Sequence, residues 1–237
     1  MFEELGAERA KLHRVAVGAE QVFFDLPGPP VGDVIELVYV GGFLPLHGVP
    51  ALIEALALLE KDAGGLPPYR VRMVGRGIDF DVTRRRAVDL GLTRVGFEGP
   101  RAYSELPSVL GTAHVVLGAF GSTAKAGRVV PHKVWQGLAA GRAVVSGDGE
   151  GVREWFEPEV HLLLVPRGEV ESLATALARV LRDADLRRRM GEAGRRRAAE
   201  VGTPARLGRE LLAVFEGLGV QGGRSRGASA GTGERRP

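Results

Sequence analysis

The sequence predicts an α/β protein built on a doubly wound parallel sheet, with extra helices at its C-terminal end. Short apolar runs rich in β-branched residues alternate with longer segments of helical periodicity. Glycines follow several of the apolar runs, where a strand would pass into a loop. The alternation repeats through six units, and this favours right-handed crossovers and a parallel sheet with helices on both faces.

The expected elements follow one another from residue 34 onward. The first strand ends at Gly41-Gly42, and the fourth ends near residues 118–121. Pro131 and Gly141 frame one helix, because proline is favoured in the first turn and glycine just past the last. The expected strands cover residues 34–40, 69–74, 94–97, 113–117, 143–146 and 161–165, and the expected helices cover 50–59, 79–90, 103–110, 131–140, 170–181 and 186–199.

Composition excludes several classes of protein. The 237 residues contain no cysteine, which excludes disulfides, thiolate metal sites and a cysteine nucleophile. No two of the five histidines have the i, i+4 spacing of a helical metal pair, and we expect no metal site. No apolar run reaches the roughly 18–20 residues of a membrane helix. An acidic pair at Glu3-Glu4 stands where a signal peptide needs basic residues, so we expect a cytoplasmic protein.

The net charge of +3 arises from the C-terminal segment of the chain. Residues 217–237 carry four arginines and one glutamate, so the remainder of the chain is neutral overall. A neutral body argues against a nucleic-acid-binding domain, which needs a basic face. The segment 217–237 is rich in glycine, serine and arginine, and we predict that it is a disordered tail.

The predicted topology locates a candidate site. In a doubly wound sheet, ligands bind outside the carboxyl ends of the strands where the strand order reverses. Here that point lies between the loop 41–48 and the loop 119–133. Gly41-Gly42 lets backbone approach a ligand closely, and His47 stands before the next helix as a possible donor. The first loop is therefore suited to a phosphate.

The second loop is basic. It opens the helix at Pro131, whose free N–H groups and dipole favour an anion. Gly121-Ser122 adds small hydrogen-bonding groups. A solvated basic face is the alternative interpretation of the same residues. The basic or potentially basic residues of this loop are Lys125, Arg128, His132 and Lys133.

Several segments together resemble a known family. Residues 38–42, 48–49, 74–77, 141–145 and 163–168 are similar to the C-terminal half of GT-B glycosyltransferases of family 4 (group 1), and residues 186–197 resemble its closing helical segment. In this family the C-terminal Rossmann-like domain binds a sugar nucleotide and a separate N-terminal domain binds the acceptor. The resemblance implies a UDP- or GDP-linked sugar as donor, with no metal or other cofactor.

The sequence departs from the family at the positions that hold the donor. The family has Arg after Val-Gly and Lys before the helix-opening glycine, where this chain has Gly42 and His47. The family also has two glutamates eight residues apart, where this chain has Arg128 and Gln136. The absence of the first glutamate, at Arg128, resembles a branch of the family that is associated with bacterial polysaccharide assembly. The absence of the second glutamate, at Gln136, is peculiar to this chain. An amide can still bond a ribose hydroxyl, without the strength of a charged acceptor.

The resemblance also implies a division of the chain and a set of site residues. Residues 1–30 would be a remnant of the acceptor domain and hinge, 31–216 the sugar-nucleotide-binding domain, and 217–237 the tail. We expect Phe23 and Phe24 to be partly exposed at a domain junction. We expect Arg128 and Lys133 to be the main diphosphate ligands, and we assign no catalytic residue. The residues expected to bind the sugar nucleotide are Gly41, Gly42, His47, Gly75, Gly121, Ser122, Lys125, Arg128, Val130, His132, Lys133 and Gln136.

The expected function is that of the donor domain of a retaining glycosyltransferase of hexosyltransferase type. It would act in bacterial polysaccharide or glycolipid assembly, be inactive without an acceptor domain, and in the full enzyme be peripheral at the inner membrane. A non-catalytic nucleotide-binding module, or one subunit of a split enzyme, is the main alternative. A sugar-nucleotide epimerase shares the architecture and is the weaker alternative, because no extra catalytic carboxylates are evident.

Overall fold

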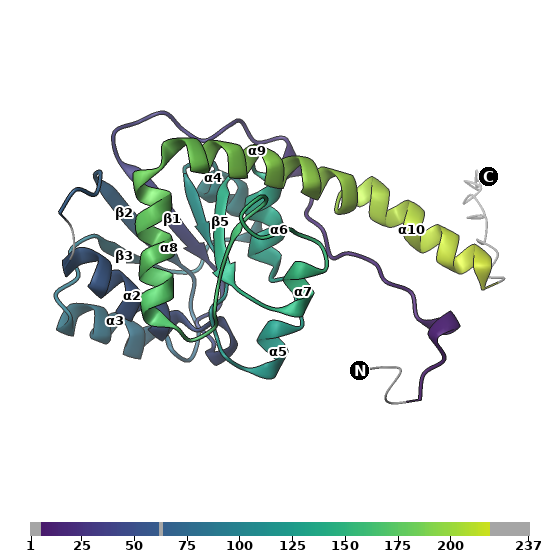
Figure 1. Cartoon of the computed structure of the whole chain (residues 1–237), viewed down its shortest axis with the longest axis horizontal. Coiled ribbons are helices and arrows are strands. Elements are labelled where there is room, and N and C mark those ends of the chain that lie inside the picture. The colour runs from purple at the N-terminus through teal and green to yellow at the C-terminus, as the bar shows by residue number, and fades with distance from the viewer. Residues whose placement is uncertain (1–5, 62–63, 219–237) are drawn as a thin grey trace, which may run out of the picture. The chain divides into compact units, whose positions relative to one another are not determined.

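The computed structural model describes residues 6–61 and 64–218. In these residues a six-stranded sheet has the order β3-β2-β1-β4-β5-β6, and each neighbouring pair is parallel. The predicted doubly wound α/β fold is confirmed (Figure 1). The strands are β1 (Ile35–Val40), β2 (Tyr69–Val74), β3 (Val95–Glu98), β4 (Val115–Leu117), β5 (Ala143–Gly147) and β6 (Leu163–Val165).

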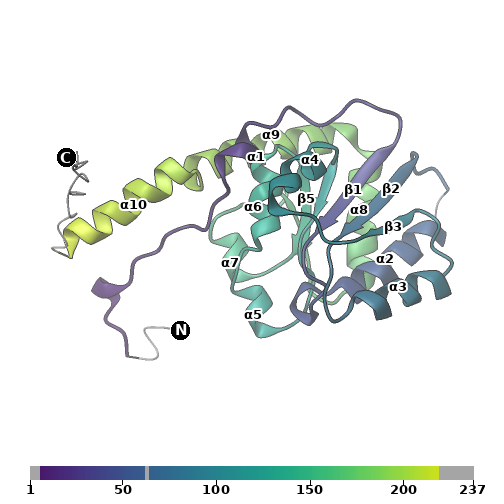
Figure 2. The same cartoon turned by 180° about the vertical axis from the view of Figure 1, so that it is seen from behind.

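Helices cover both faces of the sheet. One face packs α2, α3 and α8, and Figure 2 shows α1, α4 and α6 on the opposite face. The helices are α1 (Gln21–Phe24), α2 (Val49–Lys61), α3 (Phe80–Asp89), α4 (Leu106–Gly111), α5 (Ala124–Gly127), α6 (His132–Ala139), α7 (Glu150–Arg153), α8 (Val170–Arg182), α9 (Ala184–Val201) and α10 (Pro204–Gly217), with 3-10 turns η1 (Arg9–Lys11), η2 (Pro45–His47) and η3 (Tyr103–Glu105).

The chain divides into two units. Residues 16–207 form one unit, which contains the whole sheet, and residues 1–15 with 208–237 form the other. The described part of the second unit includes η1 and most of α10, and the apolar residues Leu211, Leu212 and Phe215 of α10 are exposed. The predicted disordered tail lies almost entirely outside the described residues. No helix in the described ranges is long and apolar enough to cross a membrane.

The strand order reverses between β1 and β4, as the sequence predicts. β1 pairs on one side with β2, in the register Tyr39↔Met73, and on the other with β4, in the register Tyr39↔Leu117. Five of the six residues of β1 are buried, because helices cover the sheet on both sides. The loops after β1 and β4 therefore leave the sheet side by side at its carboxyl edge.

The segment before β1 is packed more closely than we expected. Phe23 is fully buried and Phe24 is 8% exposed, and both join the apolar cluster that contains Trp135 of α6. The expectation that these phenylalanines are partly exposed is wrong. Arg195 of α9 fixes this segment, because its guanidinium donates to the carbonyl oxygens of Phe24 and Leu26. The backbone of residues 19–26 is thereby part of the sheet-containing unit.

Candidate functional site

The loops at the carboxyl edge of the sheet are in direct backbone contact, which glycines permit. A Cβ added at Gly75 would lie 2.0 Å from the carbonyl oxygen of Gly41. A Cβ added at Gly48 would lie 2.3 Å from the nitrogen of Gly121. Larger residues at these positions would push the loops apart. A Cβ added at Gly121 would in turn lie 2.5 Å from the carbonyl oxygen of Leu46, so Gly48, Gly75 and Gly121 all allow the loops to meet.

Lys133 lies against the carboxyl end of β1. It lies in the first turn of α6, and its side chain is 6% exposed. The Nζ atom lies 3.6 Å from the centre of the Tyr39 ring, and a Cβ added at Gly41 would lie 2.9 Å from it. Within the described ranges this buried nitrogen has no hydrogen-bond partner. The structure thus places the Lys133 amine beside Gly41, at the switch point of the sheet.

His47 and Tyr39 complete the wall beside Lys133. The carbonyl oxygen of Gly42 accepts hydrogen bonds from the Tyr39 hydroxyl at 2.6 Å and from Nδ1 of His47 at 2.5 Å. Since a carbonyl can only accept, Nδ1 of His47 carries a proton and Nε2 of the neutral ring is its acceptor atom. We define Tyr39, Gly41, Gly42, His47 and Lys133 as the Lys133 cluster.

The electrostatics of the Lys133 cluster disfavour positive charge in the free protein. Burial lowers the pKa of Lys133 well below its usual value. Burial and the nearby Lys133 lower the pKa of His47, against the opposing effect of its bond to Gly42. Burial raises the pKa of Tyr39, which keeps its hydroxyl protonated. A desolvated cation–π contact with the Tyr39 ring contributes about 2 kcal/mol, which offsets only part of the free-energy cost of burying the charged ammonium.

The remaining basic residues of the second loop do not all turn toward Lys133. Thr123 caps α5, because its hydroxyl oxygen accepts a hydrogen bond from Ala126 N at 3.3 Å. Lys125, at the second position of α5, and Arg128, just past its end, are exposed, as is Ser122. His132 faces Glu20, with 3.9 Å between Nε2 and Oε1. Val130 is half-buried and packs against the cluster that contains Trp135.

Gln136 lies in a separate polar corner on α6. Its side chain is 3% exposed, and its Nε2 donates to the Tyr103 hydroxyl oxygen at 3.0 Å. The Tyr103 hydroxyl in turn donates to Oε1 of Glu20. We define Glu20, Tyr103, His132 and Gln136 as the Glu20 corner. The sequence identified His132 and Gln136 but gave no signal for Glu20 or Tyr103, which are 83 residues apart.

Arg167 is a further residue that sequence reasoning missed. Its guanidinium donates to the carbonyl oxygens of Ala119 at 3.2 Å, Gly121 at 3.3 Å and Gly147 at 3.0 Å, and also to that of Asp148. Burial lowers its pKa, and Asp148 acts in the opposite direction. Arg167 thereby ties the loops after β4 and β5 together. The sequence around Arg167, which follows β6, contains no local pattern that predicts this contact.

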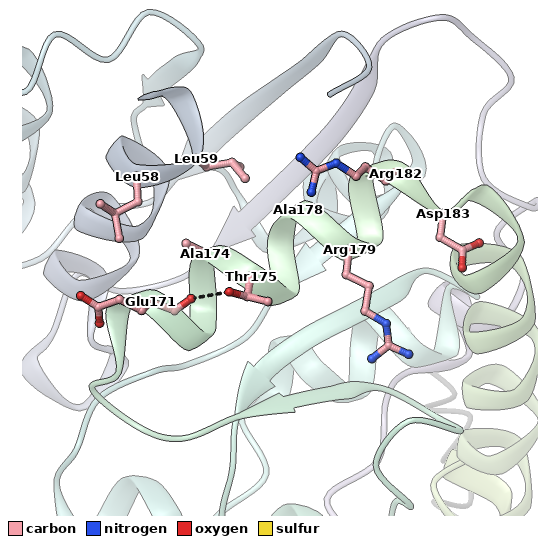
Figure 3. A pocket seen from close by; sticks show the side chains of 9 residues that line it. All are labelled: Leu58, Leu59, Glu171, Ala174, Thr175, Ala178, Arg179, Arg182 and Asp183. Carbon is pink, nitrogen blue, oxygen red and sulfur yellow. Dashed lines mark hydrogen bonds between the residues drawn. The ribbon is translucent and has the colours of Figure 1, made fainter. Parts of the chain in front are cut away.

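A cavity of about 660 Å³ lies elsewhere, between α2 and α8 (Figure 3). Leu58 and Leu59 of α2 line one side, and Arg179 of α8 lines the other and pairs with Glu159 at 2.6 Å. This groove contains none of the predicted site residues and lies over one face of the sheet, away from the Lys133 cluster. Among the described residues, no group of three or more His, Asp or Glu side chains could hold a metal ion.

Comparison with known proteins identifies relatives of the fold. The sequence model of the family described as glycosyl transferases group 1 matches residues 28–197. The HepE protein of Anabaena, solved in complex with UDP, superposes with a TM-score of 0.75 at 17% identity, over 91% of this chain and 60% of that chain. A glycosyltransferase from Rickettsia africae superposes with a TM-score of 0.72 at 16% identity, over 90% of this chain and 59% of that chain.

A third solved structure is itself a partial chain. The C-terminal domain of LpcC, a glycosyl transferase group 1 family protein from Francisella tularensis, superposes with a TM-score of 0.60 at 18% identity, over 82% of this chain and 97% of that domain. This chain spans less than two thirds of the length of the HepE and Rickettsia proteins. A comparison with curated protein sequences finds no match. The fold is that of the GT-B glycosyltransferases, and the chain belongs to the glycosyl transferases group 1 family.

Proposed function

We propose that the Lys133 cluster binds the diphosphate of a sugar nucleotide and that the chain acts as the donor domain of a retaining glycosyltransferase of family 4. The observation that carries this proposal is the buried Lys133 amine with no acceptor in the described residues. Burying an unpaired ammonium is costly, and an anion bound beside Lys133 would offset that cost. A diphosphate fits, because its oxygens accept from an ammonium, a histidine and helix N–H groups.

The same geometry would serve the chemistry of glycosyl transfer. When the bond between the sugar and the diphosphate breaks, negative charge grows on the leaving phosphate oxygens. The Lys133 ammonium and the N-terminus of α6 stand where they would stabilise that charge. No side chain caps the N-terminus of α6, whose N-cap residue is Pro131, so its first N–H groups are available to a ligand.

Gly42 and His47 change the way in which the family's diphosphate site would work. Without an arginine at residue 42, the carbonyl oxygen of Gly42 bonds Tyr39 and His47. Protonation of His47 when an anion binds would supply a second positive charge. Lys125 and Arg128 are exposed on the basic loop and would add longer-range attraction for the diphosphate. The proposal gives Arg128 a smaller role than the sequence expectation, which makes both Arg128 and Lys133 main diphosphate ligands.

The nucleotide, pathway and partner domain are also part of the proposal. HepE was solved with UDP, which makes UDP the first nucleotide to test, ahead of GDP. Residues 31–216 would be the donor domain and residues 1–30 the hinge and acceptor-side remnant, with residues 16–30 packed in the unit that contains the sheet. The matched structures are longer than this chain. The acceptor domain would come from a separate or adjoining segment, at the cytoplasmic side of the inner membrane in bacterial polysaccharide or glycolipid assembly.

A non-catalytic nucleotide-binding module is the second candidate. The uncharged Gln136, buried and bonded to Tyr103, favours it, since the family has a glutamate there. Calorimetric titration of the purified chain with UDP, GDP, UDP-glucose and UMP tests binding. We expect UDP to bind roughly tenfold or more tightly than UMP, because UMP lacks the second phosphate. Equal affinity for UDP and UMP would contradict a diphosphate site at Lys133.

The two candidates separate in a transfer assay. Transfer of sugar from a nucleotide donor by the chain supplemented with an acceptor domain, and not by the chain alone, would support the glycosyltransferase. Nucleotide binding without transfer under both conditions would support the module.

A further inference from the structure

The Glu20 corner contains a carboxylate that is only partly used. Oε1 of Glu20 accepts a hydrogen bond from Tyr103 and lies 3.9 Å from Nε2 of His132. Oε2 is buried and has no hydrogen-bond partner among the described residues. A buried acceptor without a donor costs free energy, so the corner is incomplete in the free protein.

The carboxylate is held in its ionised form. Burial raises the pKa of Glu20, but the hydrogen bond from Tyr103 and the field of His132 outweigh it, and the net pKa is lowered. Burial and the neighbouring Glu20 raise the pKa of Tyr103 to about 12, so the phenol remains a donor. An ionised carboxylate repels phosphate and accepts from neutral hydroxyl groups. The corner therefore suits a neutral O–H donor rather than a second anion.

The position of the corner relates it to the Lys133 cluster. Lys133 and Gln136 are three residues apart on α6, so their side chains leave the same face of the helix within one turn, about 5.4 Å of axis. In a nucleoside diphosphate the ribose is attached directly to the diphosphate, so the separation of these two groups is comparable to the spacing of Lys133 and Gln136 along the helix. The ribose also carries two neighbouring hydroxyl groups, which are neutral donors.

We propose that Glu20 accepts hydrogen bonds from the ribose hydroxyls of the nucleotide whose diphosphate lies at Lys133. This inference rests on the proposed function. Tyr103 and Gln136 are positioning residues that hold the Glu20 carboxylate. Oε1 already accepts from Tyr103, so Oε2 would take the ribose hydroxyls, which requires the partly exposed Glu20 side chain to rotate.

This assignment moves the ribose contact away from Gln136. The amide of Gln136 is already committed to Tyr103 and is almost fully buried, whereas the Glu20 side chain is 43% exposed. The negative charge absent from residue 136 is supplied from the segment before α1. Glu20 and Gln136 are 116 positions apart in the sequence and come together only in the folded chain.

The test compares ribose hydroxyls across matched variants of the full chain. UDP and 2′,3′-dideoxy-UDP are titrated into the parent protein, into Glu20→Gln, and into the control Glu171→Gln, which changes an exposed glutamate on α8. We expect the parent and the control to prefer UDP roughly tenfold or more, because a hydroxyl bonded to a carboxylate is lost in the analogue. We expect Glu20→Gln to reduce that preference to about threefold or less.

The possible results are distinct. A parent protein that binds neither nucleotide contradicts the proposed function itself. A parent that binds both with equal affinity, or a Glu20→Gln protein that keeps the full preference, overturns the ribose assignment alone. Tyr103→Phe provides a second variant if Glu20→Gln fails to fold. It should lower the preference only in part, because the carboxylate is still present but less well held.

Discussion

The Nζ atom of Lys133 is buried 3.6 Å from the centre of the Tyr39 ring, where none of the described residues accepts a hydrogen bond from it. An aromatic face attracts a cation, but it replaces only part of the water that a buried ammonium loses. In the free protein, the surroundings of Lys133 therefore favour the neutral amine. A ligand that brings negative charge reverses this preference.

Stability should depend on pH through Lys133. The pKa of this lysine is lowered in the folded protein and is about 10.4 in the unfolded chain, so between these values the unfolded chain binds more protons. The free energy of unfolding should therefore rise with pH across that window. Denaturant titrations at several pH values should show a smaller rise for Lys133→Met than for the parent. Parallel pH profiles for the two proteins would show that Lys133 titrates normally.

Nucleotide binding should take up protons. An anion at the Lys133 cluster favours protonated Lys133 and His47, whose pKa values are both lowered in the free protein. Affinity for UDP-glucose should consequently fall as pH rises above neutrality. Calorimetry at pH 8 in HEPES and in Tris, which differ in ionisation enthalpy and carry no phosphate to compete for the site, separates the binding heat from the heat of buffer ionisation. The slope should indicate net proton uptake for the parent and less for Lys133→Met, and no buffer dependence would exclude the coupling.

Gly41→Ala should damage the Lys133 cluster. Gly41 has a φ of +145°, and the added Cβ would lie 2.9 Å from Nζ of Lys133. Backbone strain of this kind costs about 1–3 kcal/mol, and displacement of the lysine should weaken UDP binding as well. Gly99→Ala is the matched control, because no atom lies within 4 Å of its added Cβ. Thermal melts and UDP titrations that fail to separate the two variants would contradict the close contact.

Arg167→Met should loosen the carboxyl edge of the sheet. The substitution removes the donors to Ala119, Gly121 and Gly147, which are partly buried carbonyl groups. Losing charged hydrogen bonds should cost about 1.5–3 kcal/mol of unfolding free energy, measured in urea, and should weaken UDP binding. Arg153→Met removes an exposed ion pair with Asp148 and should leave stability little changed. Equal losses for both variants would argue against the role given to Arg167.

The sequence predicts the fold better than it predicts the site. All six strands and the reversal between β1 and β4 follow from local apolar runs and glycine positions, and all are confirmed. Helix α5 is not predicted from the sequence, because its four residues are too few to show a helical period. Helix α10 was also not anticipated, and it buries none of its described residues.

The site depends on contacts between distant parts of the chain. The importance of Lys133 was inferred from its place in the first turn of α6, but its orientation toward Tyr39 on β1 was not. The bonds that join Glu20, Tyr103 and Gln136 span three separate elements, and no local spacing encodes them. Which residues of a basic loop converge on one point is decided by packing.

The binding role of Lys133 is tested most directly by titrating UDP into Lys133→Met, with Lys61→Met at the exposed end of α2 as control. We expect Lys133→Met to bind UDP roughly ten- to a hundredfold more weakly, because a charged hydrogen bond to phosphate is lost. Its melting temperature should be equal to or above that of the parent, since an unpaired buried amine is replaced by an apolar chain. A folded Lys133→Met protein that binds UDP within twofold of the parent would contradict the account.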